Sequence, residues 1–253
     1  MKNKLFQPVC MAAAILALAG ANDARATLLV YEDFEGYASG SSLIGQAGLG
    51  LGQSGNWTHQ YTAGTFTIGA GLAGAQGLTI GVGSSGDNAI TIAHTAAGWG
   101  TGEMWMSCLY NEASYVGHAY VSGGPIWAGA FGHGWSSDFG INNESGPGNV
   151  PRTLGQTYLM VAKIDWTAGS TTLWVGPQSG FDPLVQAPAV IKAEAQSTTP
   201  MLSLAFYDVV GTIDDIRIGT TSADVVPVPE PSVFALLGLG GLSLAALRRR
   251  KAV

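Results

Sequence analysis

Short apolar runs alternate with glycine, serine, asparagine and proline clusters over residues 27–226, and no helical period persists in this part of the chain. The clearest run extends from Tyr158 to Trp166. Every second residue from Tyr158 is apolar, whereas the positions between them become charged at Lys163 and Asp165. Because successive side chains of a strand point to opposite faces, this pattern predicts a strand with one face against a core.

The same reasoning predicts strands throughout residues 27–226. The segments between them favour turns, with a long excursion over 35–56, a loop over 142–150 and a tight turn at 210–211. Many short strands without helices are typical of two packed antiparallel sheets, so we predict an all-β sandwich. The predicted strands are 28–34, 57–61, 65–68, 77–82, 88–94, 102–110, 126–131, 136–141, 158–166, 171–175, 201–207 and 212–218.

The first 26 residues have the pattern of a signal peptide. Lys2 and Lys4 precede an apolar run over 9–19 that is too short to span a membrane, and Ala24 and Ala26 form a small-x-small cleavage site. We therefore expect cleavage after Ala26 and export of the domain that follows.

The C-terminal segment, residues 227–253, combines a proline-rich stretch, an apolar run and a basic end. Three prolines within 227–231 hold the backbone extended and remove amide donors. The uncharged run 232–247 would span roughly 24 Å as a helix, against about 30 Å for a bilayer core. We expect a single transmembrane helix there, with the basic end as a cytoplasmic stop. The basic end consists of Arg248, Arg249, Arg250 and Lys251.

This combination resembles the PEP-CTERM sorting signal of bacterial envelope and secreted proteins, with Pro229, Glu230 and Pro231 as its motif. The resemblance implies processing near that motif by an exosortase, a transpeptidase-like membrane protease. It also implies a precursor in the inner membrane and a product at the cell surface or in an extracellular matrix. The alternative is a plain membrane anchor, which would need no Pro-Glu-Pro.

Removing both terminal segments changes the charge of the protein. Residues 27–226 contain four Lys and Arg against 15 Asp and Glu, a formal net charge of −11 where the whole chain has −6. Such a domain repels nucleic acid and anionic lipid, so cations or neutral glycans are the favoured partners. Cys108 is the single cysteine of this part, which excludes an internal disulfide, and its apolar neighbours indicate a buried thiol.

Three patches resemble laminin-G/concanavalin-like jelly-roll domains. Residues 161–166 and 172–177 are similar to the central hairpin of those domains, 213–219 to the closing strand, and 31–35 to the opening strand that pairs beside it. The resemblance implies a concanavalin/laminin-G-like β-sandwich over residues 27–226. Because the motifs are structural, they indicate the fold and say little about function.

Candidate catalytic groups are sparse. Concanavalin-like glycosidases carry paired carboxylates on one face of a strand, about 5 to 5.5 Å apart in retaining enzymes. The nearest match here is the run from Glu32 to Glu35, in which Glu32 and Asp33 point to opposite faces. The histidines are scattered singly, so no catalytic zinc site is indicated. We therefore predict that the protein is not an enzyme.

Calcium is the ion that the sequence favours. If the first and last strands pair, Asp33, Glu35, Asp214 and Asp215 offer hard oxygen ligands near one edge. The alternative is that Asp33 and Asp214 cap strand ends and face solvent or Arg217.

The function predicted is that of an exported, non-catalytic envelope or matrix protein, with glycan or exopolysaccharide binding as the leading hypothesis. Trp57, Trp99, Trp127 and Trp135 lie in or near glycine-rich segments, where a ring could stack on a sugar. Ring packing between the sheets is the alternative for them. The alternative functions are a polysaccharide-acting glycoside hydrolase and a purely structural matrix protein.

Overall fold

The computed structural model describes residues 27–60, 65–81, 88–113, 117–124, 130–133, 138–141, 144–145, 150–177, 181–207 and 210–226. The predicted signal peptide and the segment 227–253 lie outside these residues, together with the predicted transmembrane helix and the basic end. Within the described ranges, no helix has the length and apolarity that a membrane span requires.

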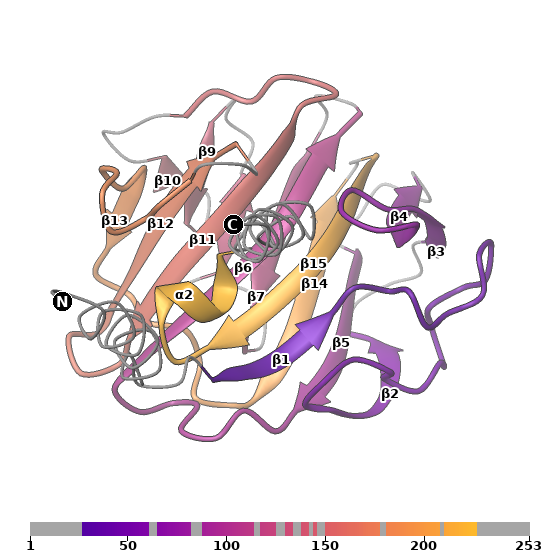
Figure 1. The fold of residues 1–253 in the computed structure, drawn as a ribbon, viewed down its shortest axis with the longest axis horizontal. Coiled ribbons are helices and arrows are strands. Elements are labelled where there is room, and N and C mark those ends of the chain that lie inside the picture. Colours follow the sequence, from indigo (N-terminus) through magenta and orange to yellow (C-terminus); the bar gives the residue numbers. More distant parts are fainter. Residues whose placement is uncertain are drawn as a thin grey trace, which may run out of the picture.

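Two antiparallel sheets form a sandwich (Figure 1). The eight-stranded sheet, called here the back sheet, has the order β13-β12-β11-β6-β15-β4-β3, and β1 pairs with β15 beside β4. Its strands are β1 (Leu28–Glu32), β3 (Thr65–Ala70), β4 (Gln76–Gly81), β6 (Glu103–Glu112), β11 (Thr157–Asp165), β12 (Ser170–Gly176), β13 (Val190–Lys192) and β15 (Gly211–Gly219).

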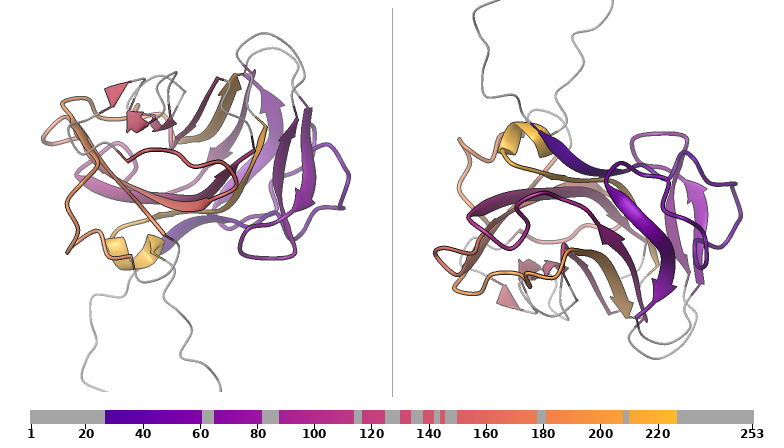
Figure 2. Two further views of the ribbon diagram at one scale, coloured as in Figure 1. Left: turned by 90° about the horizontal axis from the view of Figure 1, so that it is seen from above. Right: turned by 90° about the horizontal axis from the view of Figure 1, so that it is seen from below.

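The seven-stranded sheet, called here the front sheet, has the order β10-β9-β8-β7-β14-β5-β2. Figure 2 shows the back sheet bowed, with helix α2 (Ser222–Val225) on its outer side. The front-sheet strands are β2 (Gln53–His59), β5 (Asn88–His94), β7 (His118–Ser122), β8 (Phe131–His133), β9 (Phe139–Ile141), β10 (Glu144–Ser145) and β14 (Met201–Tyr207).

Strand β11 confirms the predicted alternation. Tyr158, Met160 and Ile164 lie in the main core between the sheets, and Leu159 and Val161 lie on the opposite face. Since each sheet sends alternate side chains inward, the core is built from both inner faces. Cys108 is buried in this core, which confirms the prediction of a buried thiol, and burial raises the pKa of that thiol.

A second apolar cluster covers the outer face of the back sheet, where the sequence pattern indicated only increasing charge along β11. Trp105 and Trp174 stack there with ring centroids 5.5 Å apart. The segment after β12 contributes Phe181, and α2 contributes Val225. On β11 itself, charge is confined to the end of the strand, where Lys163 pairs with Glu103 at 2.6 Å.

Three predictions about strands need correction. Strand β7 was missed because it is short and lies between glycines, so its sequence offers little pattern. Strand β13 was also missed, as was the two-residue β10, which lies within the predicted loop 142–150. The predicted strands 126–131 and 136–141 correspond to β8 and β9, but β8 begins only at Phe131. Finally, the predicted turn at 210–211 is displaced, because β15 already begins at Gly211, and the strands on its two sides belong to different sheets, β14 to the front sheet and β15 to the back sheet.

Candidate functional site

A row of hydroxyl side chains crosses four strands on the outer face of the front sheet. Thr58 of β2 is opposite Thr91 of β5. Thr91 is opposite Ser203 of β14, which in turn is opposite Ser122 of β7. Each of these residues follows or precedes a core side chain in its strand, so strand alternation turns it outward. We call Thr58, Thr91, Ser203 and Ser122 the hydroxyl row.

Hydrogen bonds connect parts of the row and leave one hydroxyl unsatisfied. Thr58 Oγ1 lies 3.4 Å from Thr91 Oγ1, and Ser122 Oγ donates to Gln196 Oε1 at 3.4 Å. Ser203 is buried at 0% exposure, and its Oγ has no hydrogen-bond partner within the described part of the chain. A buried hydroxyl without a partner costs about 1–3 kcal/mol, so Ser203 is the member of the hydroxyl row whose hydrogen bond the described residues do not supply.

An apolar stripe runs beside the hydroxyl row. Ala205 of β14 is opposite Ala89 of β5 on one side and Tyr120 of β7 on the other. These three residues pack with Ala130 in a small cluster of their own, separate from the main core. All four residues of this cluster are buried, so the stripe lies beneath the surface beside the hydroxyl row. Ligand sites commonly combine apolar lining with a few placed polar groups in this way.

The row is open at the β2 end and buried at the β7 end. Thr58 is exposed, as are Ser54 and Asn56 on the same strand and Ala93 on β5. Thr91, Ser203 and Ser122 are buried. Access to the row is therefore from the β2 side of the front sheet.

The front sheet is almost uncharged. Among its strands as the structure describes them, Glu144 in the edge strand β10 is the one carboxylate, and there is no Lys or Arg. Lys163, Lys192 and Arg217 all belong to strands of the back sheet. A glycosidase needs two carboxylates flanking the scissile bond, and the described strands of this face do not supply such a pair.

Two of the tryptophans considered for sugar stacking are buried. Trp57 is in the main core, where its Nε1 donates to Tyr37 Oη at 3.1 Å. Trp99 packs edge-on against His94, with ring centroids 4.9 Å apart, and its Nε1 donates to the Ser197 carbonyl. Both rings therefore pack inside the protein, which is the alternative to stacking on a sugar. Trp127 and Trp135 lie outside the described residues.

His94 belongs to the packing at this end of the sandwich. Its Nε2 lies 3.0 Å from the Gly123 carbonyl oxygen, and burial lowers its pKa, so the ring stays neutral at physiological pH. A Cβ on Gly123 would lie 2.0 Å from the Trp99 ring, so only glycine allows this approach. These contacts hold the end of β5 against the loops at Gly123 and Ser197.

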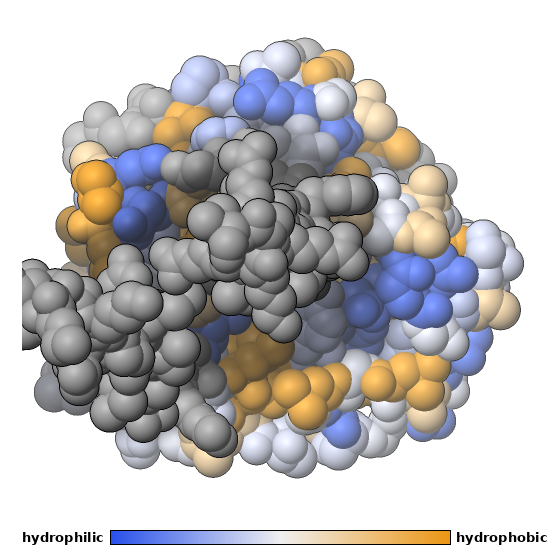
Figure 3. Space-filling view, viewed as in Figure 1, coloured by the Kyte–Doolittle hydropathy of each residue, from blue (hydrophilic) through white to orange (hydrophobic). Residues whose placement is uncertain are grey.

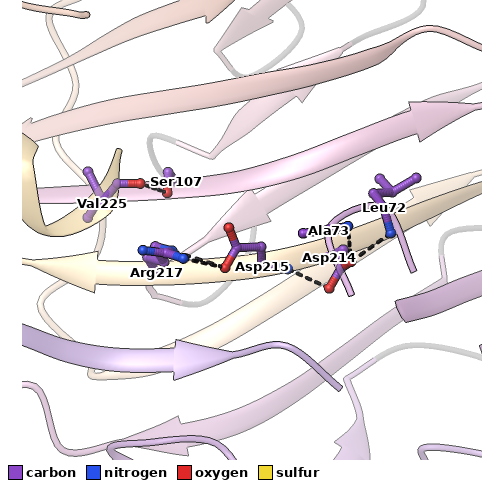
Figure 4. A network of polar contacts seen from close by, with 7 residues as sticks. All are labelled: Leu72, Ala73, Ser107, Asp214, Asp215, Arg217 and Val225. Carbon is purple, nitrogen blue, oxygen red and sulfur yellow. Dashed lines mark hydrogen bonds and ion pairs between the residues drawn. The ribbon is translucent and has the colours of Figure 1, made fainter. Parts of the chain in front are cut away.

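The four residues predicted to bind calcium lie near one another, because β1 does pair with β15 as expected. Their carboxylates, however, already have partners. Asp214 Oδ2 accepts hydrogen bonds from the backbone N–H of Leu72 (2.7 Å) and of Ala73 (2.9 Å), as Figure 4 shows. Asp214 Oδ1 accepts from the N–H of Asp215 at 2.8 Å. Asp214 thus holds the hairpin between β3 and β4.

The other three carboxylates also accept hydrogen bonds from the protein. Asp215 Oδ1 accepts from Arg217 Nε at 3.0 Å, and the Arg217 guanidinium lies 5.0 Å above the Tyr31 ring. Glu35 Oε1 accepts from the N–H of Gln76 at 2.9 Å, and Asp33 Oδ1 from the N–H of Glu35 at 3.1 Å. In the described part of the chain, no group of three or more His, Cys, Asp and Glu is placed to hold a metal ion. These hydrogen bonds agree better with carboxylates that cap strand ends and loops than with carboxylates that bind calcium.

Replacing Asp214 with asparagine is expected to lower the free energy of unfolding by about 1–3 kcal/mol, because a buried amide cannot accept all three hydrogen bonds. Urea denaturation with and without millimolar calcium measures the loss. We expect the same loss in both conditions, with Asp33→Asn as a control of small effect. A loss that appears only when calcium is present would restore the metal hypothesis.

Glu32 is buried beneath the loop that follows β1. Its Oε1 accepts from the N–H of Phe34 at 2.8 Å, and its Oε2 accepts from Tyr37 Oη at 3.1 Å. Tyr37 Oη in turn accepts from the N–H of Leu49 at 3.0 Å. Phe34 takes a left-handed φ of 59°, which ends β1 before the predicted residue 34. Glu32 is therefore enclosed, and it helps to order the start of the 35–52 excursion.

Stability is expected to depend on pH through Glu32. Burial raises the pKa of its carboxyl above the ordinary 4.5, so the native state holds the proton more tightly than the unfolded state. The stabilisation that the protonated Glu32 carboxyl provides is complete below its pKa in the unfolded state. It is lost as pH rises through its pKa in the folded state. Between pH 4 and pH 8, wild type should therefore lose stability relative to Glu32→Gln, by at most about 1.4 kcal/mol per pH unit. Parallel urea denaturation curves for the two proteins would contradict this.

Residues 227–251 match the PEP-CTERM protein-sorting motif. They contain the predicted motif Pro229, Glu230 and Pro231 and the basic end Arg248 to Lys251, all outside the described residues. Such a motif implies an exported protein that is sorted to the cell surface and processed by an exosortase. No curated protein matches the chain.

Solved structures resemble the sandwich at low sequence identity. The catalytic domain of a glycoside hydrolase family 131 protein from Coprinopsis cinerea has a TM-score of 0.57 and 12% identity, covering 81% of this chain and 99% of that one. The GH131 β-glucanase catalytic domain from Podospora anserina has a TM-score of 0.45 and 13% identity, covering 66% and 87%. Peanut lectin has a TM-score of 0.41 and 11% identity, and the match covers 76% of this chain and 97% of the lectin chain.

At such identities the likeness shows the fold alone, and only the first of these scores is high enough to carry that argument. The laminin-G part of the predicted resemblance stays a prediction. The chain thus carries a PEP-CTERM protein-sorting motif behind an all-β, concanavalin-like sandwich of two antiparallel sheets.

Proposed function

We propose that the exported domain is a non-catalytic module that binds neutral polysaccharide through the outer face of its front sheet. The observation that carries the proposal is the hydroxyl row, which is exposed at Thr58 of β2 and continues inward through Thr91 to the unpartnered hydroxyl of Ser203. Sugar hydroxyls donate and accept hydrogen bonds, so they pair with Ser and Thr side chains without a change of charge.

The distribution of charge supports a neutral ligand. The domain has a formal net charge of −11, so an acidic polysaccharide would be repelled by its overall field. The front-sheet strands contribute almost nothing to this charge, which leaves a neutral surface for a neutral chain of sugars. The lack of paired carboxylates on the described strands of this sheet supports binding without hydrolysis.

Titration of the exported protein against soluble β-glucan, mannan and alginate tests the proposal, with reducing ends assayed in the same samples. We expect saturable binding to a neutral polysaccharide, none to alginate, and no new reducing ends. Thr58→Val and Ser203→Ala should each weaken binding about 2- to 10-fold, the value of one hydrogen bond. Thr172→Val, on β12 of the back sheet, is the matched control and should bind like wild type.

The same experiment separates the alternatives. Release of reducing ends would favour a glycoside hydrolase. Absence of binding to all three polysaccharides would favour a purely structural matrix protein. Equal affinity of the three variants would place the site away from the hydroxyl row.

A further inference from the structure

Both ends of the described domain lie on one side of the sandwich. Leu28, at the start of β1, is opposite Gly219, at the end of β15. Helix α2 begins three residues after Gly219, so the chain enters and leaves the domain at neighbouring points. Both views in Figure 2 show β1 and α2 side by side.

Helix α2 is fastened to the outer face of the back sheet. Val225 is buried in the cluster on that face with Trp105 and Leu159, and its carbonyl accepts from Ser107 Oγ at 2.6 Å (Figure 4). Val226 also packs against the cluster. The sorting segment, which begins at the next residue, therefore departs from the outer face of the back sheet.

Polar contacts hold α2 in this position. Asp224 Oδ2 accepts from the N–H of Thr221 at 2.6 Å and from the hydroxyls of Thr221 and Thr220. A Cβ on Gly219 would lie 2.2 Å from Asp224 Cβ, so the helix sits directly against the end of β15. A protein held by its sorting segment is thus held at a rigid point of the back sheet.

The connection to the apolar run is short. Five residues, 227–231, separate Val226 from the start of the run, and three of them are proline. An extended chain of this length reaches roughly 17 Å, and prolines stiffen it. The face that carries α2 must therefore lie close to any membrane that the run enters.

The outer face of the back sheet combines paired charges with an exposed apolar edge. Its cations are already paired, Lys163 with Glu103 and Arg217 with Asp215. Figure 3, which views the face directly, shows apolar surface near β1, and the loop beside β1 contains Leu49 and Leu51, which are 58% and 54% exposed. Tyr31 fixes that loop to β1 by donating its N–H to the Leu51 carbonyl.

We infer that the membrane-held precursor stands with the outer face of its back sheet against the bilayer surface and its front sheet turned outward. The hydroxyl row is on the far side of the sandwich, beyond two sheets packed about 10 Å apart. A precursor in this orientation has its candidate glycan face free before it is processed. The inference rests on residues 232–247 entering the membrane and is independent of glycan binding.

Two alanine positions provide a matched pair of probes. Ala223 is exposed on α2, and Ala93 is exposed on β5 of the front sheet. Ala223→Cys and Ala93→Cys are made separately in the precursor without its predicted signal peptide, residues 27–253, which lacks Cys10. Each variant is reconstituted in vesicles and labelled with a fluorescent maleimide. Cys108 is buried and does not compete for the label.

Vesicles with nitroxide-labelled headgroups then report which face is near the membrane, against vesicles without nitroxide as the reference. The label at position 223 should lose most of its fluorescence, and the label at position 93 should retain most of it. Equal quenching at both positions, or stronger quenching at 93, would overturn the inference. Fluorescence quenching tests the orientation at the membrane, and glycan titration tests the proposed function. Either proposal can therefore fail while the other holds.

Discussion

Replacing Arg152 with methionine is expected to lower the free energy of unfolding by about 3–5 kcal/mol, since it leaves a buried carboxylate without its cation. Arg152 Nη1 donates to both carboxylate oxygens of Glu112 at 2.7 Å, and the two side chains are only 3% and 4% exposed. Single domains are stable by about 5–15 kcal/mol, so this loss is a large share of the total. Urea denaturation near neutral pH measures it.

The exposed pair between Lys163 and Glu103 is the control. Lys163→Met should cost only about 0.2–1 kcal/mol, because solvent screens that pair. Burial raises the pKa of Glu112 and Arg152 opposes this, so without Arg152 the pKa rises further. The cost of Arg152→Met should then shrink as pH falls and Glu112 takes up a proton. If Arg152→Met lowered the free energy of unfolding only as much as Lys163→Met does, the Glu112 carboxylate would not be buried as the structure indicates.

Replacing Pro229, Glu230 and Pro231 together with alanine is expected to abolish most release of the processed protein and leave the precursor in the inner membrane. The motif lies immediately after the point where the domain is fastened to its own sheet, so a protease has only a short segment in which to act. Intact-mass analysis of exported and membrane fractions measures the change, because it detects residues 232–253 when they are retained.

Pro200→Ala, at an exposed proline of the domain, is the control for expression and export. It should yield the same processed protein as wild type. Unchanged release of the triple variant would show that the motif is not what the protease recognises, and full-length mass in the exported wild type would show that no processing occurs.

The fold could be predicted largely from local pattern. Strand β11 was visible because its alternation runs without interruption through nine residues, and β5 and β14 were predicted with the observed bounds. The pairing of β1 with β15 was anticipated from the resemblance of both strands to known ones. Sheet membership was not predictable in the same way, because the crossing from β14 to β15 depends on pairings distant in sequence.

The candidate site illustrates that limit most clearly. Thr91 and Ser203 are visible in the sequence as polar residues inside apolar strands, which indicates that they face outward. Their alignment into one row is a matter of register between β5, β14 and β7, strands far apart along the chain. The buried pair of Arg152 and Glu112 was hidden for the same reason.

The acidic residues near the chain ends show how one pattern permits two outcomes. Asp33, Glu35, Asp214 and Asp215 lie in or just after the two strands that were expected to pair and do pair. Whether such carboxylates hold an ion or cap backbone N–H groups depends on loop geometry. Here the 71–76 hairpin supplies N–H donors to both Asp214 and Glu35.

Amide hydrogen exchange of the exported protein, with and without a saturating neutral polysaccharide, tests the proposed binding face most directly. If the hydroxyl row binds the ligand, protection should increase in β2, β5 and β14 and stay unchanged in β11 and β12 of the back sheet. Increased protection centred on the back sheet, or no change in any strand at saturation, would contradict the proposal.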